Sequence, residues 1–226
     1  MSRTHSPVSR RLYAEGLGSL LLAATVVGSG IMAERLAAGN LAVALLANTV
    51  ATVAVLAMLI ALLGPVSGAH FNPAVSLVAA LRGQLSWTQA ATYAATQTAG
   101  CCTGAGLAHA MFGLPLLQQA THVRSGWGQW LAEGVATFGL LLVLLGHRRQ
   151  EDAPWLVAAW IAAAYWFTAS TSFANPAITI ARSLTDTFCG IRPVDVPPFV
   201  AAQLTGAIIA LALARPLFAL GTADGR

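Results

Sequence analysis

Residues 67–75 read Ser-Gly-Ala-His-Phe-Asn-Pro-Ala-Val, and the triplet Asn-Pro-Ala returns at 175–177. Proline is tolerated in the first turn of a helix, and the asparagine before it can cap the helix. Each triplet therefore predicts the start of a short helix. The segments that hold them, 64–81 and 173–188, are too short to cross a bilayer, so we expect two re-entrant half-helices.

The sequence around these triplets is that of a membrane protein. It is 57% apolar and 9% charged, whereas an ordinary soluble domain is about 25% charged. A spanning helix needs about 20 mostly apolar residues. Six such runs occur, at 11–33, 40–63, 84–108, 126–146, 153–172 and 197–214. We predict an all-α membrane protein of six transmembrane helices plus two half-helices.

The two halves of the chain repeat each other. Residues 14–20 match 132–138 around a glutamate, and residues 96–101 match 202–207 around a glutamine. Three spans per half is an odd number, so the second half enters the membrane from the opposite side. This inverted 3+3 repeat should bring the two half-helix N-termini together near the midplane. We expect one channel domain over 1–226, with tails at 1–10 and 216–226, repeats at 11–110 and 127–215, and an outer loop at 111–126.

The charged residues indicate topology. All twelve basic residues are arginines, scattered along the chain, which argues against nucleic-acid binding. Eight of them fall on one side if the N-terminus is cytoplasmic, and four fall on the other. The excess of arginine predicts that both termini are cytoplasmic.

Together, the two Asn-Pro-Ala triplets and the paired Glu and Gln spans resemble the aquaporin, or major intrinsic protein, family over about residues 11–215. The resemblance implies a right-handed bundle that forms a homotetramer in the cytoplasmic membrane. Each monomer would carry its own pore for water or small uncharged solutes, without a cofactor. It places six residues at the pore centre: Asn72, Pro73, Ala74, Asn175, Pro176 and Ala177. There the asparagine amides would face the solute, and the half-helix dipoles would oppose cations.

One position departs from the pattern of the water-selective members. These carry an arginine directly after the second triplet, and here that residue is Ile178. A count without gaps from the two asparagines places the other members of this constriction at Thr52, Ala163 and Ser172. Such a ring is wider and less polar, so it should admit polyols and metalloid hydroxides. The aliphatic residue resembles the bacterial branch associated with arsenic handling, whose solute is neutral arsenous acid.

Five further residues stand out. His70 either lines the pore or is structural. Arg182, one turn after Ile178, either brings a positive charge to the outer vestibule or pairs with Asp186. Glu15 and Glu133 are expected to be buried structural carboxylates that bind the loop backbone. Cys189 is expected near the outer mouth, as a thiol open to mercurials or arsenite.

Three functional hypotheses follow. The first is a passive channel for small neutral solutes, including arsenous acid and glycerol, and for water. The second is a water-selective pore in which Arg182 reaches the constriction. The third is a proton-coupled transporter that uses Glu15 and Glu133. An enzyme is not expected, since the sequence has no Gly-rich phosphate loop, G-x-S-x-G motif or metal-ligand spacing.

Overall fold

The structure is a computed structural model that describes residues 7–147 and 149–218. Arg148 and the ends of the two predicted tails, with Arg3 and Arg226, lie outside the described residues. The described chain forms α1 (Val8–Leu36), α2 (Leu41–Ser67), α3 (Pro73–Leu81), α4 (Trp87–Met111), α5 (Trp127–Gly146), α6 (Ala153–Phe167), α7 (Pro176–Arg182) and α8 (Val196–Leu217), with 3₁₀ turns at Gln150–Asp152 and Pro193–Asp195. No strand occurs in these two ranges, so the all-α prediction is confirmed.

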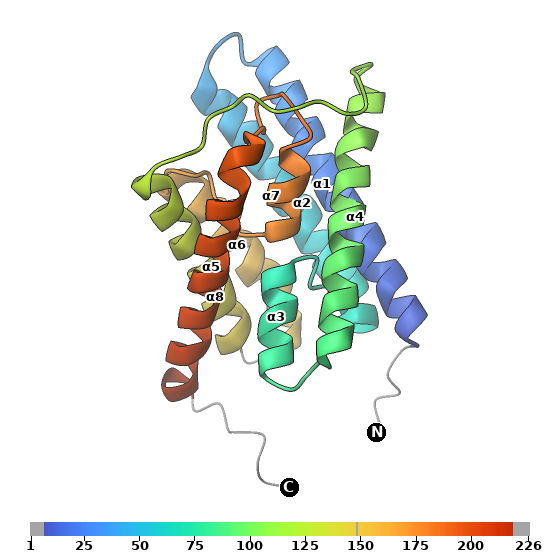
Figure 1. The fold of residues 1–226 in the computed structure, drawn as a ribbon, viewed down its shortest axis with the longest axis vertical. Helices are drawn as coiled ribbons and strands as arrows, with labels where there is room; N and C mark the ends of the chain where they lie inside the picture. The colour runs from blue at the N-terminus through green and yellow to red at the C-terminus, as the bar shows by residue number, and fades with distance from the viewer. Residues whose placement is uncertain (1–6, 148, 219–226) are drawn as a thin grey trace, which may run out of the picture.

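Six longer helices surround the two short ones. In Figure 1, α3 lies below α7, and both lie between α4 and α8. The start of α1 and the end of α8 are at the same end of the bundle, which we call the cytoplasmic end in accordance with the arginine count. The half-helix α3 lies toward the cytoplasmic end and α7 toward the opposite end, which is the inverted arrangement expected from the repeat.

The observed helices differ from the predicted spans at several ends; α2, for example, runs to Ser67, beyond the predicted end at 63. Four described helical stretches are long and apolar enough to cross a membrane by themselves: Val8–Leu36, Leu41–Ser67, Trp127–Gly146 and Pro193–Leu217. The helix α4 is long but rich in threonine, glutamine and glycine. The helix α6 ends at Phe167, five residues before the predicted end at 172, because Thr168 has extended backbone, and Thr171 and Ser172 beyond it have positive φ values of 61° and 52°. Left-handed backbone is incompatible with a right-handed helix.

Glycines allow the helices of each half to cross closely. A Cβ atom at Gly100 of α4 would collide with the carbonyl oxygen of Gly16 on α1. At the equivalent crossing in the second half, a Cβ at Gly206 of α8 would collide with the carbonyl oxygen of Gly134 on α5. Small residues permit such backbone contact between helices in membranes. The two halves are therefore built on the same helix pair.

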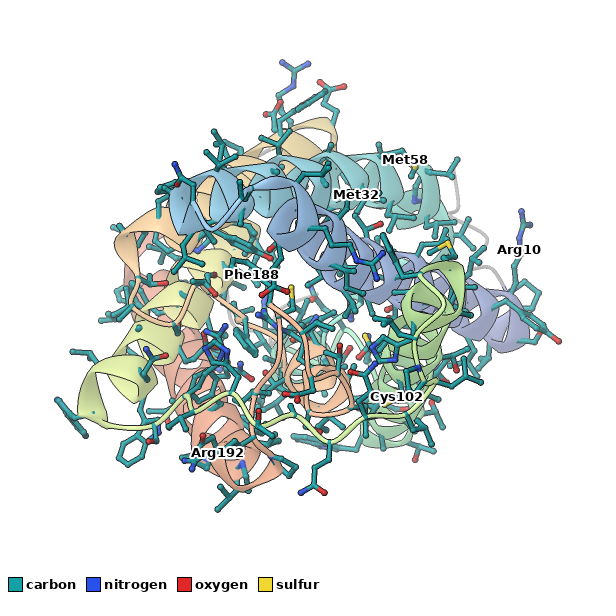
Figure 2. The ribbon with its side chains drawn as sticks, turned by 90° about the horizontal axis from the view of Figure 1, so that it is seen from above. Arg10, Met32, Met58, Cys102, Phe188 and Arg192 are labelled. Atoms are coloured by element: carbon teal, nitrogen blue, oxygen red, sulfur yellow. The ribbon has the colours of Figure 1, made fainter. Side chains whose placement is uncertain are left out.

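The outer end is covered by the connection between the halves. Residues 112–126 run across this end and pair with the segment after α7. The amide of Ala120 donates to Ser183 O at 3.1 Å, and the amide of Arg192 donates to His122 O at 2.9 Å. Seen from above in Figure 2, Phe188 lies inside the ring of helices, and Arg10 projects outward. The outer loop thus lies directly over the second half-helix.

Candidate pore: the paired half-helices and the central cavity

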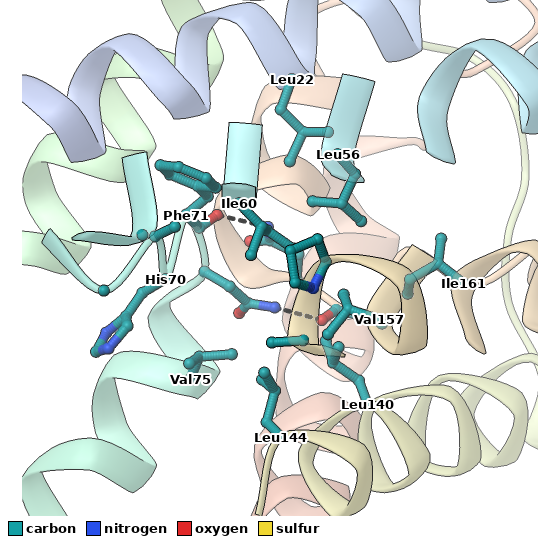
Figure 3. A pocket seen from close by; sticks show the side chains of 18 of the residues that line it. Leu22, Leu56, Ile60, His70, Phe71, Val75, Leu140, Leu144, Val157 and Ile161 are labelled. Carbon is teal, nitrogen blue, oxygen red and sulfur yellow. Dashed lines mark hydrogen bonds between the residues drawn. The ribbon is translucent and has the colours of Figure 1, made fainter. Parts of the chain in front are cut away.

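The two half-helix starts meet inside the bundle, where each asparagine caps its own helix and hydrogen-bonds to the loop of the opposite half. Asn72 and Asn175 are the N-cap residues, and their Oδ1 atoms accept from the amides of Ala74 and Ala177 at 2.9 and 3.0 Å. Their Nδ2 atoms cross to the opposite half: Asn72 donates to Ala174 O at 2.7 Å, and Asn175 donates to Phe71 O at 2.8 Å (Figure 3). Each amide has a second N–H. That N–H remains for a passing molecule.

The loops before the two asparagines have the same strained backbone. In the first loop Ala69 and Phe71 have φ values of 49° and 48°, and in the second loop Ser172 and Ala174 have values of 52° and 48°. Left-handed backbone at residues other than glycine costs about 1–3 kcal/mol each. Something in each half must therefore hold the loop in place.

A buried glutamate holds each loop, as the sequence predicted for both. Glu15 accepts from the amides of His70 and Phe71 at 3.0 and 2.7 Å. Glu133 accepts in the same way from Phe173 and Ala174 at 2.8 and 2.9 Å. Both carboxylates are fully buried, and neither lines the central cavity. This arrangement counts against a proton relay through these two residues.

A glutamine and a hydroxyl complete each set of contacts. Gln97 Nε2 donates to Glu15 at 2.8 Å and lies 3.0 Å from Ser76 Oγ. In the second half, Gln203 Nε2 donates to Glu133 and lies 2.8 Å from Thr179 Oγ1. The glutamates and glutamines of the sequence repeat therefore meet at the two loops.

A cavity of about 1360 Å³ passes the two asparagines. It extends from Arg11 and Glu151 near the cytoplasmic end to Arg182 near the outer end. Figure 3 shows the aliphatic side chains that form much of its wall: Leu22, Leu56, Ile60, Val75, Leu140, Leu144, Val157 and Ile161. In an apolar passage of this kind a solute exchanges its hydration for a few fixed polar groups.

The structure brings three of the four expected constriction residues to this cavity. Thr52, Ser172 and Ile178 line it, and all three are buried. The hydroxyls of Thr52 and Ser172 are buried with no protein partner among the described residues. Each hydroxyl therefore has a hydrogen-bonding capacity that no described protein group uses.

Ala163 does not belong to the cavity, so the count without gaps misplaces this member. Its side chain is exposed on the outside of α6, and Tyr165 lines the cavity instead. The count runs through the non-helical loop 168–174, where distance along the chain no longer fixes the helix face. The 3.6-residue period fixes it, since Val157, Ile161 and Tyr165 are spaced four apart and share one face. That spacing was present in the sequence.

The histidine and arginine singled out by the sequence both line the cavity. His70 Nδ1 lies 3.0 Å from Ser76 Oγ, and its ring packs edge-to-face on Tyr93 at 5.5 Å. Arg182 is 3% exposed, and its Nε donates to Cys189 O. It does not pair with Asp186, which accepts instead from the amide and hydroxyl of Thr121 at 2.8 and 2.9 Å. Asp186 therefore binds the outer loop and not Arg182, the residue four positions before it.

The expectation that the Cys189 thiol is open to mercurials or arsenite is wrong. The residue is fully buried, its thiol lies 3.2 Å from Val26 O, and it does not line the cavity. Its Sγ atom occupies the space beside Gly30 of α1, where a side chain would collide with it. Cys189 is therefore a packing residue. Among the described residues, no group of three His, Cys, Asp or Glu side chains is placed to hold a metal ion.

Two half-helices lie inside a bundle of apolar helices, joined by hydrogen bonds from their N-cap asparagines to the opposite loops, and a cavity passes their N-termini. This arrangement defines a membrane protein of the channel type. Known proteins similar to this chain are also channels by name. The model of the family described as major intrinsic protein matches residues 2–154. The chain is 58% identical to "Aquaglyceroporin AqpS" of Rhizobium meliloti (strain 1021), over 92% of this chain and 90% of that protein. The chain belongs to the major intrinsic protein family.

More distant relatives share the same architecture. "Aquaporin A" of Dictyostelium discoideum is 31% identical, over 76% of this chain and 67% of that protein. The X-ray structure of the aquaglyceroporin from Plasmodium falciparum superposes with a TM-score of 0.71 at 19% identity. The superposition covers 95% of this chain and all of that one. At this identity the likeness concerns the fold alone.

Proposed function

We propose that the chain is a passive channel for small uncharged solutes and for water. The solutes are glycerol, arsenous acid and related metalloid hydroxides, which move down their gradients without a cofactor. The channel would act in the cytoplasmic membrane as a homotetramer with both termini cytoplasmic. The aquaglyceroporin name of the 58% identical relative supports this solute class.

The observation that carries the proposal is Ile178. It stands directly after the second Asn-Pro-Ala, is buried, and lines the cavity. It faces a passage whose polar groups include the partnerless hydroxyls of Thr52 and Ser172. In such a ring the aliphatic side chain contacts the carbon atoms of a polyol, and the hydroxyls form hydrogen bonds with its oxygens. The ring therefore suits a neutral hydroxy compound.

The centre of the pore favours neutral molecules. The free N–H groups of Asn72 and Asn175 are positioned to replace lost hydration. The N-termini of α3 and α7 each carry the equivalent of roughly +0.5 charge. Hydrogen-bond donors and positive dipoles together admit an oxygen acceptor and disfavour a cation.

The test is vesicle volume by stopped flow after matched osmotic steps of sucrose, glycerol and arsenous acid, with empty liposomes as control. We expect shrinkage followed by protein-dependent re-swelling for glycerol and arsenous acid. Ile178→Arg should reduce the re-swelling rate by at least about tenfold and reduce water flux much less, because the larger side chain narrows the ring. Equal loss of both fluxes would refute the assignment of Ile178.

A second candidate, a water-selective pore, is favoured by the position of Arg182. This residue and Tyr165 both line the cavity, so a polar and narrower ring can form without an arginine at 178. In that case only water moves rapidly through the unmodified protein. Arg182→Ala would then open the pore to glycerol. The first proposal predicts rapid glycerol flux already in the unmodified protein.

A further inference from the structure

Two buried arginines surround one phenylalanine at the outer mouth. The Cζ atom of Arg182 lies 3.4 Å from the centroid of the Phe173 ring, and that of Arg124 lies 4.9 Å from it. Arg182 belongs to α7, whereas Arg124 comes from the outer loop. Phe173 is itself fixed edge-to-face by Phe199 at 5.3 Å. We call Arg124, Phe173 and Arg182 the outer cation stack.

Neither guanidinium of the stack forms an ion pair with a carboxylate among the described residues; the charge of Glu133, which binds the amides of Phe173 and Ala174, favours the protonated form of Arg124 without contacting it. Arg124 donates from Nε to Gly190 O at 2.8 Å and from Nη1 to Ser170 O at 3.2 Å, and Arg182 donates to Cys189 O. All three acceptors are neutral carbonyls. Asp195 accepts from the backbone amide of Arg124, and its side-chain partner is Arg192. The stack therefore keeps two positive charges.

Burial and the neighbouring charge act on Arg124 in the same direction. Burial first, and then the charge of Arg182, lower the pKa of Arg124 to about 10. The side chain still carries its proton at neutral pH. Both guanidiniums are nearly inaccessible to water, at 8% and 3% exposure, so counterions screen them poorly.

We propose that the outer cation stack is a second cation barrier of this channel, in addition to the half-helix dipoles at the pore centre and separate from the ring at Ile178. The proposal rests on the passive channel function proposed above. Ile178 sets the width of the pore, and Arg182, one turn farther out on the same face, presents the charge to the cavity. Arg124 does not line the cavity. It acts through Phe173, as a positioning residue that also adds the second charge.

This separation follows from the geometry of α7. A single arginine at position 178 would narrow the pore and repel cations at the same point. Here the aliphatic side chain leaves room for a neutral solute, and the charge stands at the entrance. A pore of this kind passes bulky neutral molecules and still excludes sodium ions and protons.

The experiment measures cation leak and neutral flux on the same proteoliposomes. Proton entry under a valinomycin-imposed potassium potential is followed with a trapped pH-sensitive dye, and water flux is followed by stopped flow. Arg124→Gln should raise proton leak on the order of tenfold and leave water flux within about twofold. Arg124→Lys should restore the barrier because it retains the charge. Arg35→Gln is the matched control, since Arg35 also stacks on a phenylalanine, Phe112 at 5.0 Å, but is exposed and away from the cavity.

Two results would overturn the proposal. One is a leak in Arg124→Gln no greater than in the unmodified protein, and the other is an equal rise in Arg35→Gln. Should Arg124→Gln fail to fold, Arg182→Gln tests the same barrier from α7, and an unchanged leak there also refutes it. If the unmodified protein passes water but not glycerol, the solute proposal fails. The leak comparison remains interpretable because water flux reports an open pore.

Discussion

The loops before the two half-helices have the same backbone and different chemistry. Two residues before its asparagine the first loop has His70, and the second loop has Phe173 at the same point. Four residues before the glutamine of each half stand Tyr93 and Phe199. Each pair packs edge-to-face, at 5.5 and 5.3 Å. The same aromatic contact therefore occurs in both halves, with polar rings in the first half and apolar rings in the second.

The surroundings of the two aromatic pairs differ in the same sense. At the cytoplasmic loop, Tyr93 accepts from Arg11 Nε at 2.7 Å and donates to Ser67 O at 3.1 Å. The Arg11 guanidinium also lies over the Tyr93 ring, 5.3 Å from its centroid. At the outer loop the phenyl rings have no hydroxyl, and two guanidiniums, those of Arg124 and Arg182, stack on Phe173. The glutamate and glutamine of each half thus fix the backbone of its loop. The positions between them are free to give each mouth its own chemistry.

The largest effect is expected from removing the carboxylate that both loops share. Glu15→Gln and Glu133→Gln should each destabilise the protein by about 3 kcal/mol or more, because each carboxylate accepts several buried hydrogen bonds. We expect both variants to lose water flux as well. Thermal unfolding in detergent, with stopped-flow water flux, provides the measurement. If only one variant is impaired, the two loops are not held in equivalent ways.

A second prediction exchanges the residue that differs. His70→Phe loses the contact with Ser76 but keeps its packing on Tyr93, so it should cost about 1 kcal/mol. Phe173→His places an imidazole between two guanidiniums and should cost more, about 1–2 kcal/mol from the lost cation–π contacts. Thermal unfolding of the two variants side by side checks the order. Equal losses would mean that the outer stack contributes no extra stability.

The same exchange predicts a dependence on pH. Two adjacent cations oppose protonation of a histidine at position 173, so its folded-state pKa should lie below the value of about 6.5 in the unfolded chain. The unfolded state then binds more protons, and stability falls as pH drops below about 6.5. Phe173→His should therefore lose more stability between pH 7.5 and pH 5 than the unmodified protein. A parallel pH profile for both proteins would contradict the prediction.

The smallest effect is expected at His122, an exposed residue of the outer loop. Partial desolvation of the ring, followed by the charges of Arg124 and Arg182, lowers the pKa of His122. Its folded form therefore resists protonation, and a small part of the stability is lost as pH falls below about 6.5. His122→Gln should flatten this part of the stability profile slightly. A profile that is unchanged within error at pH 5–7 would show that the outer charges do not reach this residue.

The sequence predicted the features that depend on local chemistry and on the repeat. The Asn-Pro-Ala triplets place both helix starts correctly, since capping and the proline φ angle are local properties. The Glu and Gln motifs predicted where the halves correspond. The pairing of Glu15 and Glu133 with the loop backbone was also predicted, because a buried carboxylate needs donors.

The errors arise where contacts depend on long-range packing. Ala163 was misplaced because the left-handed loop residues break the helical register between α6 and Asn175. Asp186 binds Thr121, which is 65 residues away in the sequence. Cys189 is buried against α1. Arg124 was counted only as a topology signal, because nothing in its own segment shows that Phe173 is beside it.

The crossed asparagine bonds have a consequence for how the protein is made. They join residues 102 and 104 positions apart, so the first loop is synthesised long before its partner. At about 5–20 residues per second, the ribosome needs on the order of 5–20 seconds to supply the second loop. During this interval the left-handed backbone of the first loop depends on Glu15 and its neighbours alone. The first loop can therefore form its full set of hydrogen bonds only after residues 174 and 175 have been synthesised and inserted.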